Sequence, residues 1–153
     1  MECFVAGTKE RYEFLKWPKE SRCGVTTKNV LINKDAFKGF TLVSRDSTGQ
    51  PYSYEDLYVC DENRDIRVKI TVTNAASFDK AKDNLIQRLA TFTNPLVDKW
   101  NPDYLPIDVG YATGDSKLVT ANFIIGNTLV DIANVGLDKI NLTEFIKAIE
   151  SQF

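Results

Sequence analysis

The stretch IRVKITVT, residues 66–73, is the most regular pattern in this chain. Its apolar residues occupy every second position: Ile66, Val68, Ile70 and Val72. The residues between them are polar: Arg67, Lys69, Thr71 and Thr73. Successive side chains of a β-strand point to opposite faces, so this strand has one apolar and one polar face. Such a pattern is typical of an antiparallel sheet that is packed on one side and wet on the other.

Further strands are predicted on both sides of this stretch. Residues 30–32, 39–45 and 57–61 precede it, and residues 107–114, 117–125 and 128–134 follow it. Between the two groups an amphipathic helix is predicted to begin after Ser77, a good N-cap residue, and to end at Asn94-Pro95. Its apolar stripe repeats at three- and four-residue intervals: Phe78, Ala81, Leu85, Leu89 and Phe92.

The order of these elements occurs twice. Residues 39–94 and residues 107–153 each predict three strands followed by a helix, a βββα unit. Residue identity between the two stretches is slight, so an internal duplication and two convergent uses of a common motif both stay open. The sequence predicts one α+β domain over residues 1–153: an antiparallel sheet with two helices packed on one face. Residues 2–17 are predicted to form an N-terminal β-hairpin around a turn at GTKE.

The last helix begins in NVGLDKINLTEFIKAIE, residues 134–150, which resembles half of a calcium-binding EF-hand. With Glu144 at the final ligand position, Ala133, Val135 and Leu137 stand where that loop needs oxygen ligands, so we expect no calcium site. Helix initiation explains the string better. Asn141 is predicted as the N-cap and Glu144 as its capping-box partner, with a staple between Ile140 and Phe145. The predicted buried stripe is Leu142, Phe145, Ile149 and Phe153.

Composition restricts the chemistry available to the protein. The chain has 153 residues, a net charge of −2 and no histidine. Catalysis through a Ser-His-Asp or Cys-His arrangement, and metal binding through histidine, are therefore excluded. Glycine-rich phosphate-binding motifs and basic-aromatic RNA-binding patches are also missing, and no apolar run is long enough to span a bilayer. We expect a protein that is not an enzyme, without a cofactor, a nucleic-acid partner or a membrane span.

The three cysteines, Cys3, Cys23 and Cys60, include no CxxC pair. They allow either one disulfide with a spare thiol or three free thiols, and the sequence does not choose between these states. Cys60 is predicted to lie on a half-buried strand. No secretory signal is visible at the first residues. We expect a cytoplasmic protein if the chain is complete, and an extracytoplasmic one if a signal was removed.

The candidate contact residues are aromatic side chains that the predicted core stripes leave over. The segment WNPDY, residues 100–104, combines Trp100, Asp103 and Tyr104 with a stiffening proline, and Trp17 is a further candidate. Aromatic residues are enriched at protein interfaces, although each can equally pack in a core. Asp98, Asp103, Asp108 and Asp115 suggest a glycosidase-type acid pair only weakly, because acids in polar turns are usually solvated.

These features together predict a protein-interaction or inhibitor-type module. Its contact surface is expected to be the free sheet face or the loop over residues 95–106. The alternative is a carrier for a small molecule or lipid, with a pocket between sheet and helices.

Overall fold

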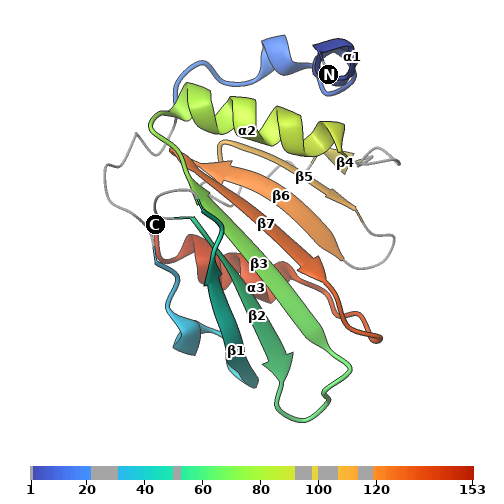
Figure 1. Cartoon of the computed structure of the whole chain (residues 1–153), viewed down its shortest axis with the longest axis vertical. Helices are drawn as coiled ribbons and strands as arrows, with labels where there is room; N and C mark the ends of the chain where they lie inside the picture. The colour runs from blue at the N-terminus through green and yellow to red at the C-terminus, as the bar shows by residue number, and fades with distance from the viewer. Residues whose placement is uncertain (1, 22–30, 50–52, 92–97, 100–106, 114–118) are drawn as a thin grey trace.

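The computed structural model describes residues 2–21, 31–49, 53–91, 98–99, 107–113 and 119–153. Seven strands of this described part form one antiparallel sheet in the order β1-β2-β3-β7-β6-β5-β4 (Figure 1). They are β1 (Phe40–Ser47), β2 (Tyr54–Cys60), β3 (Arg67–Asn74), the two-residue β4 (Asp98–Lys99), β5 (Val109–Thr113), β6 (Thr120–Ile125) and β7 (Thr128–Asn134). Helices α2 (Phe78–Ala90) and α3 (Thr143–Glu150) pack on the sheet. The predicted α+β class, with an antiparallel sheet and two helices, is confirmed.

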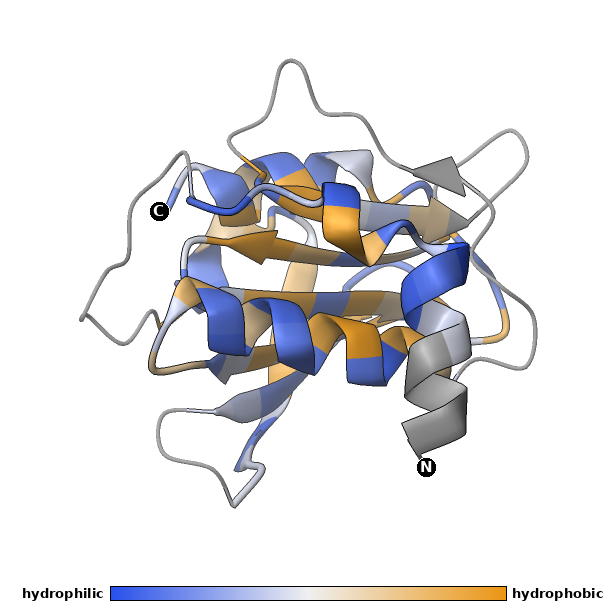
Figure 2. Cartoon of the chain, turned by 90° about the horizontal axis from the view of Figure 1, so that it is seen from above, coloured by the Kyte–Doolittle hydropathy of each residue, from blue (hydrophilic) through white to orange (hydrophobic). Residues whose placement is uncertain are grey.

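The two helices do not share a face of the sheet. Phe123 and Ile125 of β6 pack in one core cluster with the buried residues of α3, whereas Ile124 between them packs with the buried residues of α2. Because neighbouring residues of a strand point to opposite faces, α2 and α3 lie on opposite sides. Figure 2 shows the sheet between them, with hydrophobic residues concentrated in its strands. In this detail the sequence prediction of one shared face is wrong.

Alternation along β3 works as the sequence predicts. Val68, Ile70 and Val72 are fully buried on the side of α3, while Arg67 is exposed on the other side. At β6 and β7 both faces of the sheet are covered, and every residue from Ala121 to Val130 is buried. The strands β6 and β7 therefore lie in the middle of a three-layer sandwich.

The order βββα occurs twice, as β1-β2-β3-α2 and β5-β6-β7-α3. The antiparallel strands β3 and β7 join the two units at the centre of the sheet. A rotation that exchanges two antiparallel neighbours keeps each face of the sheet on its own side. Such a rotation would therefore place α2 and α3 on the same face of the sheet. Because they lie on opposite faces, the helices do not follow this symmetry.

The N-terminal segment is helical where the sequence predicts a hairpin over residues 2–17. Helix α1 (Glu2–Arg11) is followed by a short 3₁₀ turn, η1 (Phe14–Lys16), and α1 packs against α2. The hairpin prediction is wrong because its mixed alternation of polar and apolar residues is outweighed by tertiary packing. Glu13, with φ 53° and ψ 46°, adopts the left-handed conformation that often ends a helix.

Helix α3 begins slightly later than the sequence predicts. Leu142 is the N-cap residue, and the Asn141 side chain accepts hydrogen bonds from the backbone N and the Oγ1 of Thr143, at 3.0 and 2.7 Å. The predicted capping box is wrong, since Glu144 makes no back-bond and instead pairs with Lys147. Leu142, Phe145 and Ile149 are buried as predicted. Ile146 is buried beside them. Phe153 is 38% exposed, so the buried stripe ends one turn earlier than the sequence predicts.

Ser77 caps α2 as the sequence predicts, accepting a hydrogen bond from the backbone N of Lys80 at 3.0 Å. The stripe of α2 is buried as well: Phe78, Ala81, Leu85 and Leu89, with Ile86 beside them. Phe92 lies outside the described residues. Cys60 is half-buried on its strand, as the sequence predicts, and its thiol is free.

Candidate functional sites

The face of β1, β2 and β3 that points away from α3 is not covered by a helix of the described chain. Helix α2 lies over β6 and β7 instead, because the apolar side chains that receive it belong to β5, β6 and β7. We call this surface the open face. Its side chains are exposed or half-buried: Thr41, Glu55, Leu57, Val59, Arg67, Lys69, Thr71 and Thr73. It mixes apolar, charged and hydroxyl groups.

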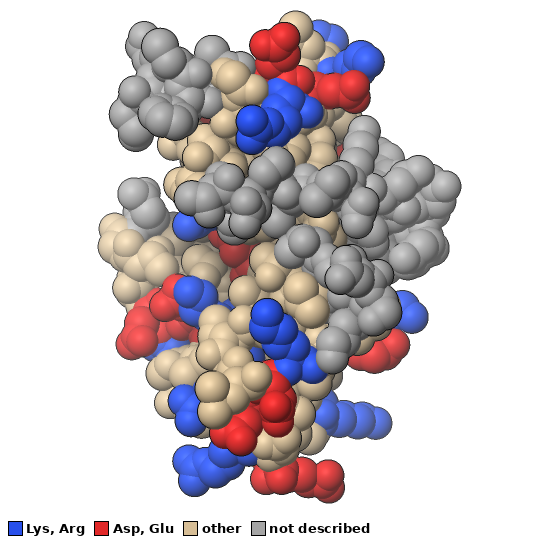
Figure 3. Space-filling view, turned by 90° about the vertical axis from the view of Figure 1, so that its right-hand side faces the viewer, with Lys and Arg blue, Asp and Glu red and all other residues tan. Residues whose placement is uncertain are grey.

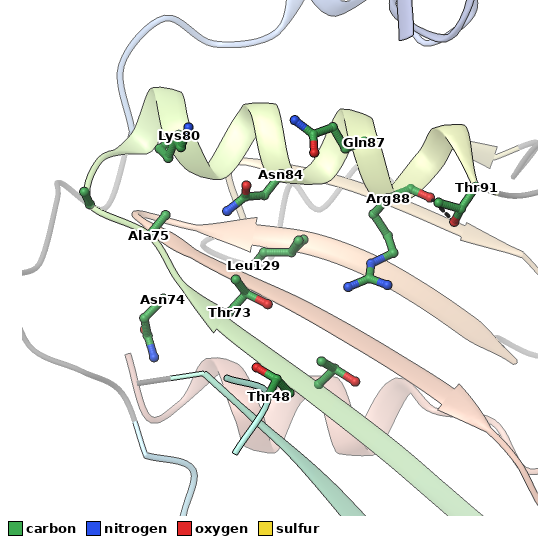
Figure 4. Close-up of a pocket in the computed structure, with 12 residues that line it drawn as sticks. Thr48, Thr73, Asn74, Ala75, Lys80, Asn84, Gln87, Arg88, Thr91 and Leu129 are labelled. Carbon is green, nitrogen blue, oxygen red and sulfur yellow. Dashed lines mark hydrogen bonds between the residues drawn. The ribbon is translucent and has the colours of Figure 1, made fainter. Parts of the chain in front are cut away.

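A groove of about 620 Å³ runs along the inner border of the open face, between α2 and β3 (Figure 4). Its sheet side carries Thr71 and Thr73, with Leu129 at the base. Its helix side carries polar groups of α2: Lys80, Asn84, Gln87 and Arg88, followed by Thr91. Figure 4 shows Arg88 extending from α2 toward the strands. The walls therefore offer both hydrogen-bond donors and apolar surface.

A row of polar side chains crosses the sheet from the open face to the space beneath α2. Cross-strand pairing places Glu55 beside Thr71, Thr71 beside Asp131, and Asp131 beside Asn122. Thr71 Oγ1 donates to Glu55 at 3.3 Å, and the Asn122 amide donates to Asp131 Oδ1. The row thus connects the solvent-facing surface to a polar group buried within the sandwich.

Asp131 is the carboxylate in this row next to Asn122, the residue at its inner end. Arg88 Nε lies 3.3 Å from Asp131 Oδ2, yet that oxygen accepts no hydrogen bond, and Asn122 Oδ1 is likewise unpaired and buried. Burial raises the pKa of Asp131 above its ordinary value, opposed by the nearby Arg88, the Asn122 hydrogen bond and Lys69. A largely buried acid with a raised pKa beside a groove is a feature that functional sites share with structural ion pairs.

A second hollow, which we call the α3 pocket, lies where residues 36–40 meet α3. It has a volume of about 580 Å³. The apolar lining is Ala36, Phe37, Phe40, Ile140, Phe145 and Ala148. Its polar lining is Lys38, Asn141, Glu144 and Lys147. The pocket lies between the edge of the sheet and a helix, and its volume falls within the range of small-molecule sites.

Of the contact residues that the sequence predicts, Trp100, Asp103 and Tyr104 lie outside the described residues. Trp17 is only 3% exposed and packs in the core cluster of α2. Its Nε1 donates to Tyr12 O at 2.8 Å and lies 3.1 Å from Tyr111 Oη. Burial raises the pKa of Tyr111, which donates to the same carbonyl. Trp17 thus anchors the N-terminal segment to the sheet.

Arg88, Asp131 and Asn122 are candidate site residues that the sequence prediction missed. An available signal was the acid within the apolar run TLVDIAN, residues 128–134, since a charged residue at a buried position needs a partner. Its partner Arg88 lies 43 positions earlier in the sequence, so the pair could be identified only from the fold.

The described residues contain no group of three or more His, Cys, Asp or Glu side chains placed to hold a metal ion. No helix in the described part of the chain is long and apolar enough to cross a membrane. On the side of the molecule in Figure 3, the coloured Lys and Arg side chains are interspersed with Asp and Glu. That side shows no extended area of a single charge among its coloured residues.

Comparison with known proteins gives no relative for this chain: no family model, no curated protein and no solved structure matches it.

Proposed function

We propose that the protein is a non-enzymatic binding module that holds a protein partner on the open face and in the adjoining groove. The observation that carries this proposal is the position of α2. The helix covers β6 and β7, and no helix in the described part of the chain lies over β1, β2 and β3 on the same side. A rigid sheet with one half-face free offers a preformed surface for docking.

The chemistry of the surface fits a protein partner. Leu57 and Val59 supply apolar area, while Lys69 pairs loosely with Glu55 at 3.7 Å in solvent. Solvated pairs of this kind contribute little to stability, so they are free to exchange partners on binding. The groove adds donors from Asn84, Gln87 and Arg88 along one border.

Site-directed photocrosslinking tests this proposal. A photoreactive residue replaces Leu57 on the open face, and a matched control replaces Ser151, which is exposed at the end of α3. In cells that naturally produce the protein, we expect Leu57 to give one discrete adduct that Ser151 does not give. Adding Thr71→Arg, which places a bulky charge on the open face, should abolish the adduct. Identical adducts from both positions would contradict the proposal, as would an adduct that Thr71→Arg leaves unchanged.

A carrier for a small apolar molecule is the second candidate function. The α3 pocket is the observation that favours it, because apolar side chains of the main core reach the surface there. This site lies on the α3 side of the sheet, so the two candidate functions use different surfaces.

A further inference from the structure

The floor of the α3 pocket is built from phenylalanine rings. Phe37 and Phe145 stack with centroids 4.5 Å apart, and Phe40 meets Phe145 edge-on at 4.7 Å. Phe37 and Phe145 are buried, whereas Phe40 is only partly buried. Ring contacts of this kind hold the three side chains in defined positions. The floor is therefore preformed.

The apolar core is open at this pocket. Partly buried hydrophobic residues packed against the main core are Phe40, Leu42, Ile140 and Ala148. All of them except Leu42 line the α3 pocket. An apolar molecule bound here would cover these side chains and remove their remaining surface from water.

The rim of the pocket carries an uncompensated positive charge. Lys147 pairs with Glu144 at 3.6 Å, but no ion pair joins Lys38 to any other described residue. Lys38 is exposed on the opposite side of the rim from α3, two residues before Phe40. The rim thus holds two cations and one anion above an apolar floor.

From this combination we infer that the α3 pocket binds an anionic amphiphile, a fatty acid whose chain lies on the phenylalanine floor and whose carboxylate meets Lys38. The inference rests on the carrier function, the second candidate above, and names its ligand class. The apolar floor selects the chain, and the uncompensated cation selects a carboxylate over an alcohol or an ester. Each additional buried methylene should tighten binding about fourfold until the floor is covered.

Displacement of a fluorescent fatty acid tests the inference. The probe is 11-(dansylamino)undecanoic acid, and the competitors are decanoate, dodecanoate and dodecanol. Lys38→Glu reverses the rim charge. Lys34→Glu is its matched control, because Lys34 is an exposed lysine four residues earlier, at the start of the short 3₁₀ helix η2 (Lys34–Ala36), and does not line the pocket. Ala148→Gln places a longer neutral side chain in the pocket from a half-buried helix position. The melting temperature of each variant shows whether it folds.

We expect dodecanoate to displace the probe at lower concentration than decanoate, and dodecanol to be about fivefold weaker. Lys38→Glu should weaken dodecanoate about fivefold and leave dodecanol unchanged, while Lys34→Glu alters neither. Ala148→Gln should remove binding of the probe.

Two results would overturn the inference, and they differ in what else they refute. If dodecanoate and dodecanol compete equally and Lys38→Glu changes neither, the preference for an anion is wrong and the carrier function stands. If the probe does not bind, or if Ala148→Gln in folded form binds it as well as the parent chain, the α3 pocket is not a ligand site. The carrier function then fails as well.

Discussion

Asp56 is a fully buried carboxylate, and its charge is balanced from the neighbouring strand. Arg45 Nε and Nη2 donate to its two oxygens at 2.7 and 2.8 Å, and Tyr58 donates at 3.2 Å. The hydrogen bond and attraction to Asp56 raise the pKa of Arg45 further above its ordinary value, and burial raises the pKa of Tyr58. Both neighbours therefore stay protonated, and this cluster is satisfied within the protein.

We predict that Arg45→Met lowers the free energy of unfolding by about 3 kcal/mol, because it leaves Asp56 buried without its cation. The value is at the low end for buried pairs, since the Arg45 side chain is 27% exposed. Urea denaturation measures the change. The control is Arg67→Met at an exposed position, which should change the free energy by no more than about 0.5 kcal/mol. A loss below about 1 kcal/mol for Arg45→Met would show that Asp56 does not depend on this cation.

Asp131 should make stability depend on pH in the direction opposite to that of most carboxylates. Its pKa in the folded chain is raised by burial, whereas in the unfolded chain it stays near 3.8. Between these two values the folded chain binds the additional proton, so its stability falls as the pH rises. The charged groups that face Asp131 are Arg88 of α2 and Lys69 of β3, both of which reduce the shift.

The test compares the unfolding free energies of the parent chain and Asp131→Asn from about pH 3 to about pH 7. Relative to the variant, the parent chain should lose stability as the pH rises through the acidic range. The difference between the two proteins removes the contribution of all other carboxylates. A parent chain that gains stability with pH relative to Asp131→Asn would mean that attraction to Arg88 outweighs burial.

At the scale of elements, strand edges and hairpins explain which surfaces are available. Strand β1 is an edge strand, but its register shifts between Leu42 and Ser44, and Arg45 points inward to Asp56. A bulge and an inward-pointing charge are common devices against edge-to-edge pairing. This arrangement supports the open face, rather than the β1 edge, as the docking surface.

The sequence of the β6–β7 hairpin indicates that both of its faces are covered, which is part of the information needed to place the helices. The run ANFIIGNTLV, residues 121–130, is apolar at positions of both parities, a pattern typical of strands that are covered on both faces. Alternation in IRVKITVT correctly predicts a strand with one wet face. Which strands each helix covers depends on the path of the chain between strand and helix. Local sequence patterns do not specify this path.

Gly136 fixes the segment after β7 against the turn before β3. Backbone hydrogen bonds on either side of it join Val135 to Arg67 at 2.9 Å and Asp138 to Asp65 at 3.0 Å. A Cβ atom at residue 136 would overlap the Asp65 carbonyl and lie 2.8 Å from the Arg67 nitrogen. Since both neighbours are backbone atoms, neither can move aside without breaking the contact.

We therefore predict that Gly136→Ala lowers the free energy of unfolding by about 1–3 kcal/mol. The matched control is Gly7→Ala within α1, where nothing lies within 4 Å of the added Cβ atom. It should stabilise the chain by up to about 1 kcal/mol, because alanine favours the helix more than glycine does. Denaturant titration of both variants measures the two changes. Equal effects of the two substitutions would show that the close approach at Gly136 is absent.

For the molecule as a whole, the sequence predicts the class, most strands, the α2 stripe and its cap. It fails at α1, whose helix depends on packing against α2, and at the placement of α3 on the other face of the sheet. The groove is also beyond sequence patterns, because its walls come from β3 and from α2 only once the helix lies over β6 and β7. Local periodicity specifies the elements, and tertiary packing creates the surfaces that we propose as sites.

The open face exists because, among the described residues, helices cover both sides of the sheet at β7 but only one side at β3. The exposed fractions of neighbouring residues show this difference. Leu129 and Val130 are both buried, at 1% and 0% exposure, whereas Thr71 is half-buried beside the fully buried Val72. A chain with both helices on the face that α3 covers would instead leave Leu129 accessible.

Thiol labelling of single-cysteine variants tests this claim most directly. Each of the four residues is replaced by cysteine in a chain whose Cys3, Cys23 and Cys60 have been changed to alanine, and the rate of maleimide modification is measured under native conditions. We predict rapid labelling of Thr71→Cys and protection of Val72→Cys, Leu129→Cys and Val130→Cys. Labelling of Leu129→Cys as fast as that of Thr71→Cys, or protection of Thr71→Cys equal to that of Val72→Cys, would contradict the account.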